Sequence, residues 1–248
     1  MSYRALLFDL FDTLVLFDRT RLPEVQVDGR RIRSTAGRLH AAFRGFAPEV
    51  PLSRFVEALL WSWQEAERIR NETHREVAAA ERLALLVRRL GLSPEALGAA
   101  AIETLLRTHM HALSEAMVFP EHHAGLLADL RGGHRLAVVS NFDYAPTARL
   151  VLEREGVAGL FDAVVVSDEV GWRKPLPLIF ETALDRLGVR AGDALFVGDR
   201  LDIDVAGARG VGMTTVWINR EAAAVPDGHM PPDFEIHDLG QLRAIVGI

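Results

Sequence analysis

Four short apolar runs, each ending before a small or polar residue, limit the folds open to this chain more than any other feature of its sequence. Every position in these runs is apolar, which is typical of strands buried on both faces, as in a parallel sheet. The four runs and a fifth that follows them cover residues 5–8, 136–139, 163–166, 194–197 and 214–218, and helical patterns cover residues 145–154, 175–187 and 202–209. Strands alternating with helices predict right-handed βαβ units. We therefore expect an α/β fold with a Rossmann-like, doubly wound parallel sheet.

The stretch between the first and second runs has a different character. It lacks buried-strand patterns and instead repeats apolar residues at helical spacing, apart from a short hairpin predicted over residues 23–33. We expect an all-helical domain over residues 17–117. This domain would interrupt a core domain that consists of residues 1–16 and 118–248.

Two local patterns within this insertion predict specific features, an apolar helical face and the start of a helix. Phe55, Leu59 and Trp63 share one helical face and are expected in the core of the inserted domain. Thr73 and Glu76 have the spacing of a capping box, which predicts the start of a helix.

Charge and cysteine content exclude several classes of protein. The 248 residues include 34 acidic and 28 basic side chains, a net charge of −6, so nucleic-acid binding through a basic patch is not expected. The absence of cysteine excludes disulfide scaffolds and thiolate zinc sites. No segment approaches the length of a membrane span, and the N-terminus lacks the pattern of a signal peptide. We expect a cytoplasmic protein, and the sequence does not indicate its oligomeric state.

Arginine provides every basic residue except one, and the exception is Lys174. Codon bias explains a general preference for arginine, but it does not explain the single lysine. An ammonium is a compact point charge, whereas a guanidinium is a planar fork, so some sites do not tolerate the exchange. This contrast singles out Lys174 as a candidate functional residue.

Polar residues gather where the predicted strands end. Because the carboxyl ends of parallel strands meet at one edge of a sheet, these side chains are expected to lie close together. The set comprises Asp9, Thr13, Ser140, Asn141, Asp199 and Asp204, with Lys174 in the loop after the third strand. Three carboxylates at one sheet edge repel each other unless a cation neutralises them, and carboxylate oxygens suit a hard divalent ion.

These residues fall in four motifs that resemble those of the haloacid dehalogenase-like hydrolase superfamily. The motifs occur in the family's order over residues 8–14, 138–141, 173–180 and 198–208, and the helical insertion lies where the family's cap domain of the first type belongs. The resemblance implies a hydrolase, in particular a phosphatase of class EC 3.1.3, that acts on a small phosphorylated or otherwise anionic molecule.

The resemblance also implies a role for each motif residue. Asp9 would be the nucleophile that forms an aspartyl-phosphate, and Lys174 would balance the charge of the nucleophile and the phosphoryl group. Thr13 and Ser140 would donate hydrogen bonds to the phosphoryl oxygens, and Ser140, Asn141 and Lys174 would bind the substrate. One Mg²⁺ would be held by Asp9, the backbone carbonyl of Phe11, Asp199 and Asp204.

One position departs from the pattern of the family's phosphatases. They carry a second aspartate two residues after the nucleophile, which serves as general acid and base, but here that residue is Phe11. In an extended chain side chains alternate in direction, so we expect Asp12 to point away from the phosphoryl side. The phosphatase would then be slow.

Two alternatives remain open beside the phosphatase. The first is a metal-independent 2-haloacid dehalogenase, in which Asp9 displaces a halide. Dehalogenases of this type usually replace the acidic pair of the fourth motif, whereas this chain keeps Asp199 and Asp204. The second is a phosphate-binding or interaction protein with little turnover on the same fold.

Overall fold

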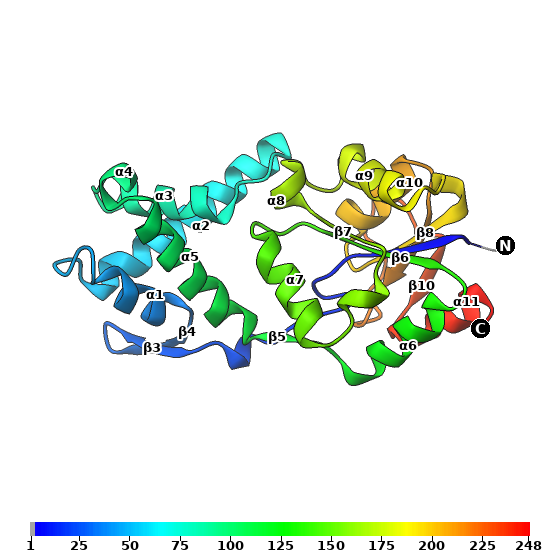
Figure 1. Cartoon of the computed structure of the whole chain (residues 1–248), viewed down its shortest axis with the longest axis horizontal. Coiled ribbons are helices and arrows are strands. Elements are labelled where there is room, and N and C mark those ends of the chain that lie inside the picture. The colour runs from blue at the N-terminus through cyan, green and yellow to red at the C-terminus, as the bar shows by residue number, and fades with distance from the viewer. Residues whose placement is uncertain (1–2) are drawn as a thin grey trace. The chain divides into compact units, whose positions relative to one another are not determined.

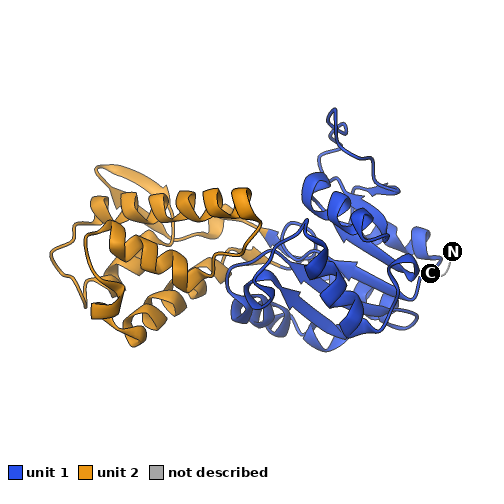
Figure 2. Cartoon of the chain, turned by 90° about the horizontal axis from the view of Figure 1, so that it is seen from above, with its two compact units in different colours: residues 1–16, 119–248 blue, residues 17–118 orange. Residues whose placement is uncertain are grey.

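The chain forms two compact units in the structure, which is a computed structural model (Figure 2). Unit 1 contains the residues up to Leu16 together with Phe119–Ile248, and unit 2 contains Phe17–Val118. The chain passes between the units at two short strands, β2 (Leu16–Phe17) and β5 (Met117–Val118), which pair with each other.

Unit 1 is built on a six-stranded sheet whose neighbouring strands all pair in parallel (Figure 1). In sheet order the strands are β10 (Phe234–Ile236), β9 (Thr214–Ile218), β8 (Ala194–Gly198), β1 (Ala5–Phe8), β6 (Arg135–Ser140) and β7 (Ala163–Val166). All five predicted strands are present, and β1, β7 and β9 have the predicted bounds. The parallel α/β sheet is therefore confirmed.

Helices and short helical turns connect these strands. They are α6 (Glu121–Arg131), α7 (Ala145–Arg154), η2 (Ala158–Leu160), α8 (Ser167–Val170), α9 (Pro177–Leu187), η3 (Ala191–Asp193), the π-helical turn η4 (Leu201–Val205), α10 (Ala206–Gly210), η5 (Leu239–Gln241) and α11 (Leu242–Val246). In Figure 1, α9 and α10 lie above the strands and α6 lies below them. Ile179, Phe180 and Leu187 of α9 are fully buried against the strands, in a core that includes Leu7 and Phe196.

Unit 2 is mostly helical, as predicted, with the predicted hairpin at its start. Its elements are η1 (Arg19–Arg21), β3 (Glu24–Val27), β4 (Arg30–Arg33), α1 (Ala36–Phe43), α2 (Leu52–Thr73), α3 (Ala79–Arg89), α4 (Pro94–Leu97) and α5 (Ala99–Ser114). β3 and β4 pair antiparallel around Asp28 and Gly29, both of which adopt positive φ angles. The helices bury one apolar face each, which explains why the helical spacing was visible in the sequence.

Two predictions about α2 were wrong. Trp63 is 54% exposed, because Ser62 rather than Trp63 continues the buried stripe that begins at Phe55. Seven residues bring a helix back to nearly the same face, whereas eight move it on by most of a right angle. Thr73 is the last residue of α2 and starts no helix, because His74 adopts a left-handed conformation that ends the helix there. Glu76 pairs with Arg70 instead of capping a helix.

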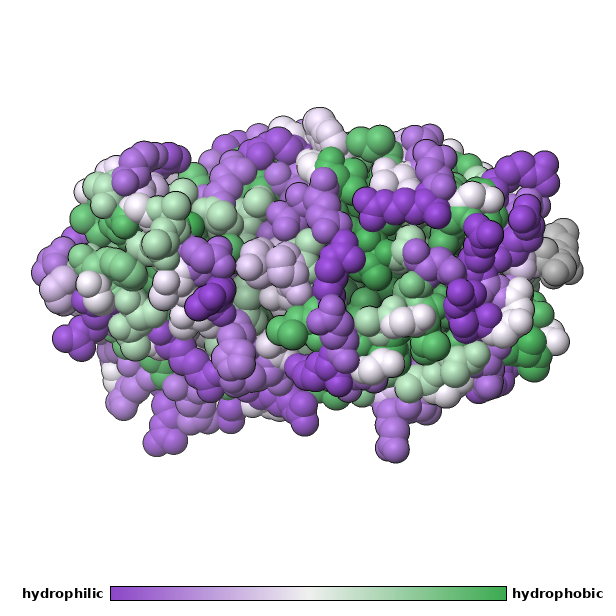
Figure 3. All heavy atoms as spheres, in the orientation of Figure 1, coloured by the Kyte–Doolittle hydropathy of each residue, from purple (hydrophilic) through white to green (hydrophobic). Residues whose placement is uncertain are grey.

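Helix α9 begins at Pro177, two residues later than predicted. Leu176 has extended backbone angles, which is the conformation that a following proline favours. In residues 3–248, the part of the chain that the structure describes, no helix is long and apolar enough to cross a membrane. Hydrophilic and hydrophobic side chains are interspersed over the face shown in Figure 3.

Candidate active site

The strand order of unit 1 contains a point of reversal, where sheets of this kind bind ligands. From β1 in the middle of the sheet, the chain adds β6 and β7 on one side and β8, β9 and β10 on the other. The order therefore reverses between β1 and β8, and ligands of such sheets bind at the carboxyl ends of the strands that flank this point. Asp9 follows β1 directly, and Asp199 follows β8 directly.

The loop after β1 turns back sharply instead of continuing as extended chain. Asp12 has a φ angle of 57°, its backbone N–H donates to the carbonyl of Val15 at 2.6 Å, and Phe11 forms a bridge with Val15. Asp12 and Phe11 both line the same cavity as Asp9, which has a volume of about 190 Å³. The expectation for Asp12 assumed an extended backbone, which its left-handed φ angle contradicts, so the direction of its side chain does not follow from strand alternation.

Lys174 is buried in the middle of the site, with 3% of its surface exposed. Its Nζ donates to Asp9 Oδ1 at 2.5 Å and to the carbonyl of Val139 at 2.9 Å, and it lies 2.7 Å from Asp204 Oδ1. Asn141 holds the backbone of Lys174 on both sides, because its Nδ2 donates to the lysine carbonyl and its Oδ1 accepts from the lysine N–H. The structure thus gives Asn141 a positioning contact, and its binding of substrate stays a prediction.

Asp204 reaches the same centre from η4. It is buried, and its Oδ2 accepts a hydrogen bond from the backbone N–H of Arg200. A Cβ atom at Gly198 would lie 2.4 Å from the Asp204 carboxylate, so only glycine at the end of β8 lets this side chain approach the strand. The π-helical form of η4 is rare and is found frequently at functional sites.

The electrostatics of the cluster show an excess of negative charge. Burial raises the pKa of Asp9 to about 6, against the opposing effect of Lys174. Burial, together with the charges of Asp9 and Asp204, raises the pKa of Asp199 to about 8. Burial disfavours the ammonium of Lys174, but Asp204 and Asp9 outweigh it and raise the lysine pKa. Three carboxylates against one ammonium make an arrangement that a further cation would stabilise.

The donor set fits a hard divalent cation. One carboxylate oxygen from each of Asp9, Asp199 and Asp204 can be chosen so that all three lie within 4.8 Å of one another. Such oxygen ligands are what Mg²⁺ takes in proteins, usually together with water. Part of the predicted metal set is therefore brought together by the fold, whereas the contribution of the Phe11 carbonyl stays a prediction.

Two buried hydroxyl groups lie at the same strand ends. Thr13 Oγ1 and Ser140 Oγ are fully buried, and neither has a hydrogen-bond partner among the residues that the structure describes. A buried hydroxyl without a partner is costly, so these two groups are suited to donate to a bound ligand. Their donation of hydrogen bonds to phosphoryl oxygens stays a prediction.

Two residues that the sequence analysis did not place at the site hold the nucleophile loop. Arg220, just after β9, donates through Nη2 to the carbonyl of Thr13 at 2.9 Å. His123 of α6 is fully buried and lies with Nδ1 2.9 Å from the carbonyl of Leu14, to which it donates. Arg220 could have been found by the rule that singled out the other strand ends, whereas His123 lies in a helix and carries no such signal.

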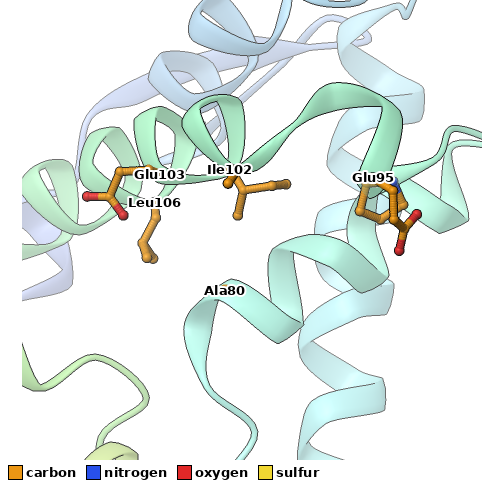
Figure 4. Close-up of a pocket in the computed structure, with 7 residues that line it drawn as sticks. Ala80, Glu95, Ile102, Glu103 and Leu106 are labelled. Atoms are coloured by element: carbon orange, nitrogen blue, oxygen red, sulfur yellow. The ribbon is translucent and has the colours of Figure 1, made fainter.

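The structure contains two further hollows. One, of about 430 Å³, shares Asp12 and Asp199 with the first cavity and extends to Trp217 and Arg220. The other, of about 370 Å³, lies in unit 2 between α3, α4 and α5, with Ala80, Glu95, Ile102, Glu103 and Leu106 on its walls (Figure 4). Its lining is mostly aliphatic and includes no lysine, arginine or histidine, so it offers little chemistry of its own.

Comparison with known proteins agrees with this geometry. The profile of the haloacid dehalogenase-like hydrolases matches residues 3–212. Glyceraldehyde 3-phosphate phosphatase from Methanopyrus kandleri is 37% identical over 167 residues, which cover 65% of this chain and 70% of that protein. The chain spans about half the length of other curated relatives that it matches.

Solved structures that resemble this one include both phosphatases and dehalogenases. A haloacid dehalogenase-family phosphatase from Thermococcus onnurineus is 28% identical with a TM-score of 0.63, over 98% of each chain. A 2-haloacid dehalogenase from Pseudomonas syringae is 25% identical with a TM-score of 0.69, over 99% of this chain and 98% of that one. The fold, the order of the motifs and the family profile lead to the same assignment: this chain belongs to the haloacid dehalogenase-like hydrolases.

Proposed function

We propose that this protein is a Mg²⁺-dependent phosphatase that hydrolyses a small phosphomonoester through an aspartyl-phosphate on Asp9. The observation that carries the proposal is the cluster of Asp9, Asp199 and Asp204 around a single buried ammonium, because it has the charge and the donors for a divalent cation. The similarity to named phosphatases supports the same reaction class. In this proposal unit 1 is the catalytic core and unit 2 is the cap.

The contacts of Asp9 assign different tasks to its two oxygens. Oδ1 accepts from Lys174, so Oδ2 is the oxygen that attacks phosphorus, while the bond from phosphorus to the leaving oxygen breaks. Thr13 and Ser140 donate to the phosphoryl oxygens, and Lys174 offsets the charge of both partners. A Mg²⁺ held by Asp9, Asp199 and Asp204 would neutralise phosphoryl charge and help to orient the phosphate group. Attack of water on the aspartyl-phosphate then releases phosphate and restores Asp9.

Turnover is expected to be slow on substrates with basic leaving groups. Phe11 stands where the family's phosphatases carry their acid and base, and a phenyl ring donates no proton. A positioned acid or base contributes about 10²–10⁴-fold. The same residue keeps the dehalogenase as the second candidate, since a halide leaves without a proton and a 2-haloacid dehalogenase is among the structural neighbours.

The experiment is a calorimetric titration with Mg²⁺ combined with panels of phosphomonoesters and 2-haloacids. We expect Mg²⁺ to bind and to be required for phosphomonoester hydrolysis. Asp199→Asn should weaken Mg²⁺ binding by more than about tenfold, since even outer-shell partners of a metal are worth about 10–100-fold. Asp193→Asn, at a surface ion pair with Arg190, is the matched control.

Three results would decide against the proposal. Halide release without added metal would establish the dehalogenase instead. Phosphate binding with no turnover on either panel would establish a binding protein. Phosphomonoester hydrolysis that is indifferent to Mg²⁺ and to Asp199→Asn would remove the metal from the proposal.

A further inference from the structure

An aromatic pair stands beside the nucleophile. The rings of Phe11 and Phe142 have centroids 4.8 Å apart and planes tilted by 55°, and both side chains are half-buried. Phe11 lines the cavity that contains Asp9, and Phe142 directly follows Asn141, which lines the same cavity. The pair is therefore part of the same strand-end region as the charged cluster.

Hydrogen bonds fix the backbone of both residues of the aromatic pair. Ser167 is fully buried, and its Oγ accepts from the backbone N–H of Phe142 at 2.9 Å and donates to the carbonyl of the same residue at 3.2 Å. On the other side, the bonds from Asp12 to Val15 fix the turn that carries Phe11. Aromatic rings on a fixed backbone make a preformed surface, which loses little conformational entropy when a ligand covers it.

The rest of the cavity is strongly polar. Its wall includes the carboxylates around Lys174 and the guanidinium groups of Arg173 and Arg200, and the apolar residues on it are Phe11 and Ile203. A phosphoryl group accounts for the charged part of this wall, but it gains nothing from a phenyl ring. Binding sites place their few polar groups to orient a ligand and use apolar and aromatic walls to contact its apolar part.

We infer that the leaving group of the substrate carries an aromatic ring that packs on Phe11 and its partner Phe142. The substrate class is then a phosphomonoester of an aryl or arylmethyl alcohol, rather than of a small sugar or an aliphatic acid. The inference rests on the proposed function. In the reaction, the bond between phosphorus and the ring-bearing oxygen breaks with its electron pair on that oxygen, which takes a proton from water.

The test measures ring preference by binding, so that it does not depend on turnover. Benzylphosphonate and ethylphosphonate, which are not hydrolysed, are titrated by calorimetry into the wild-type protein in the presence of Mg²⁺. We expect benzylphosphonate to bind more tightly. In Phe11→Leu and Phe142→Leu the preference should fall by about two- to tenfold, the usual worth of an aromatic contact beyond its area.

The matched control is Phe161→Leu, which removes a half-buried ring from unit 1 that does not line the cavity. This variant should keep the full preference. Equal binding of the two phosphonates to the wild type would overturn the inference, and so would a preference that survives in both variants of the aromatic pair.

Hydrolysis of benzyl phosphate and ethyl phosphate is measured in parallel and separates the two proposals. Hydrolysis of both esters without ring preference leaves the phosphatase standing and removes the aromatic subsite. Ring-selective binding of phosphonates without hydrolysis of any phosphomonoester keeps the subsite and removes the phosphatase.

Discussion

Each unit of this protein contains a buried cation with carboxylate partners, and the two clusters differ in their surroundings. In unit 2, Arg70 is 7% exposed and donates to Glu76 at 2.9 Å, to Glu67 at 2.6 Å and to the carbonyl of Val77 at 2.8 Å. In unit 1, Lys174 is 3% exposed and lies between Asp9 and Asp204. Burial alone does not separate these two sites.

The two clusters differ in whether further carboxylates and a cavity adjoin the buried cation. Each nitrogen of the Arg70 guanidinium donates to an oxygen, and Arg70 and Glu76 line none of the three hollows described above. Around Lys174, a third carboxylate at Asp199 has its pKa raised to about 8, and the cluster opens on a cavity. A buried cation whose donors all have partners, away from these cavities, serves the fold, whereas carboxylates with raised pKa values beside a cavity are typical of a functional site.

The largest expected effect is that of Asp9→Asn on turnover. Removing the nucleophile should lower phosphomonoester hydrolysis by several orders of magnitude, because an amide cannot form the aspartyl-phosphate. Circular dichroism and urea denaturation should show that the variant is folded. A folded Asp9→Asn protein that retained turnover would show that the surplus charge at Lys174 does not mark the nucleophile.

The next effect concerns stability and the other cluster. Glu76→Gln leaves the buried Arg70 with one carboxylate partner fewer, and breaking a buried ion pair costs about 3–5 kcal/mol of unfolding free energy. Urea denaturation measures this loss, and kcat per folded molecule should be unchanged. Glu72→Gln, on the helix that carries Arg70 and at the exposed pair with Arg68, is the control and should change little. A loss of kcat in folded Glu76→Gln would mean that the Arg70 cluster also serves the reaction.

The sequence predicted the part of this site that depends on strands. The apolar runs that end just before Asp9 and Ser140 define buried strands. Parallel strands bring their carboxyl ends to one sheet edge, and this does not depend on the conformation of the loops. The solitary Lys174 could be singled out by residue type alone. Its position between two carboxylates then follows from where β1 and η4 deliver Asp9 and Asp204.

The remaining features depend on conformations or partners that no local pattern encodes. Asp12 lines the cavity and its backbone adopts a left-handed angle, which the alternation rule for strands does not anticipate. Arg220 and His123 donate hydrogen bonds to backbone carbonyls that lie 207 and 109 residues away in the sequence. Because every residue has a backbone carbonyl, the sequence does not indicate which one is the partner. The predicted burial of Trp63 was wrong by one position, because each successive residue of a helix is rotated by about 100° around the helix axis.

The cations of the two clusters differ in shape, and Lys174→Arg tests whether the shape matters. The ammonium of the buried Lys174 donates to Asp9 and to the Val139 carbonyl, and a planar guanidinium cannot reproduce the same contacts. Turnover should fall by about 10²–10³-fold, the usual cost of losing one preorganised donor at a reacting group. Steady-state kinetics on the folded variant provide the measurement. Full activity would make the single lysine of the sequence a coincidence.

The smallest expected effect separates the buried histidines of the two units. His109 in unit 2 is bonded through both ring nitrogens, to Thr35 and to Arg82, whereas Nε2 of His123 in unit 1 has no partner among the described residues. Burial lowers the pKa of His123 from 6.5 to about 4. Between these values the unfolded chain binds the proton and the folded chain does not. The stabilisation is therefore complete above pH 6.5 and is lost as the pH falls to about 4.

The loss should amount to about 1–3 kcal/mol of unfolding free energy, since one pKa unit corresponds to about 1.4 kcal/mol. His123→Asn is the comparison, because its amide nitrogen can keep the bond to the Leu14 carbonyl without titrating in this range. Urea denaturation of both proteins at steps from pH 7 to pH 4 gives the difference between their stability curves. The wild-type curve should fall more steeply below pH 6.5, and parallel curves would mean that the ring of His123 finds a proton acceptor as the pH falls.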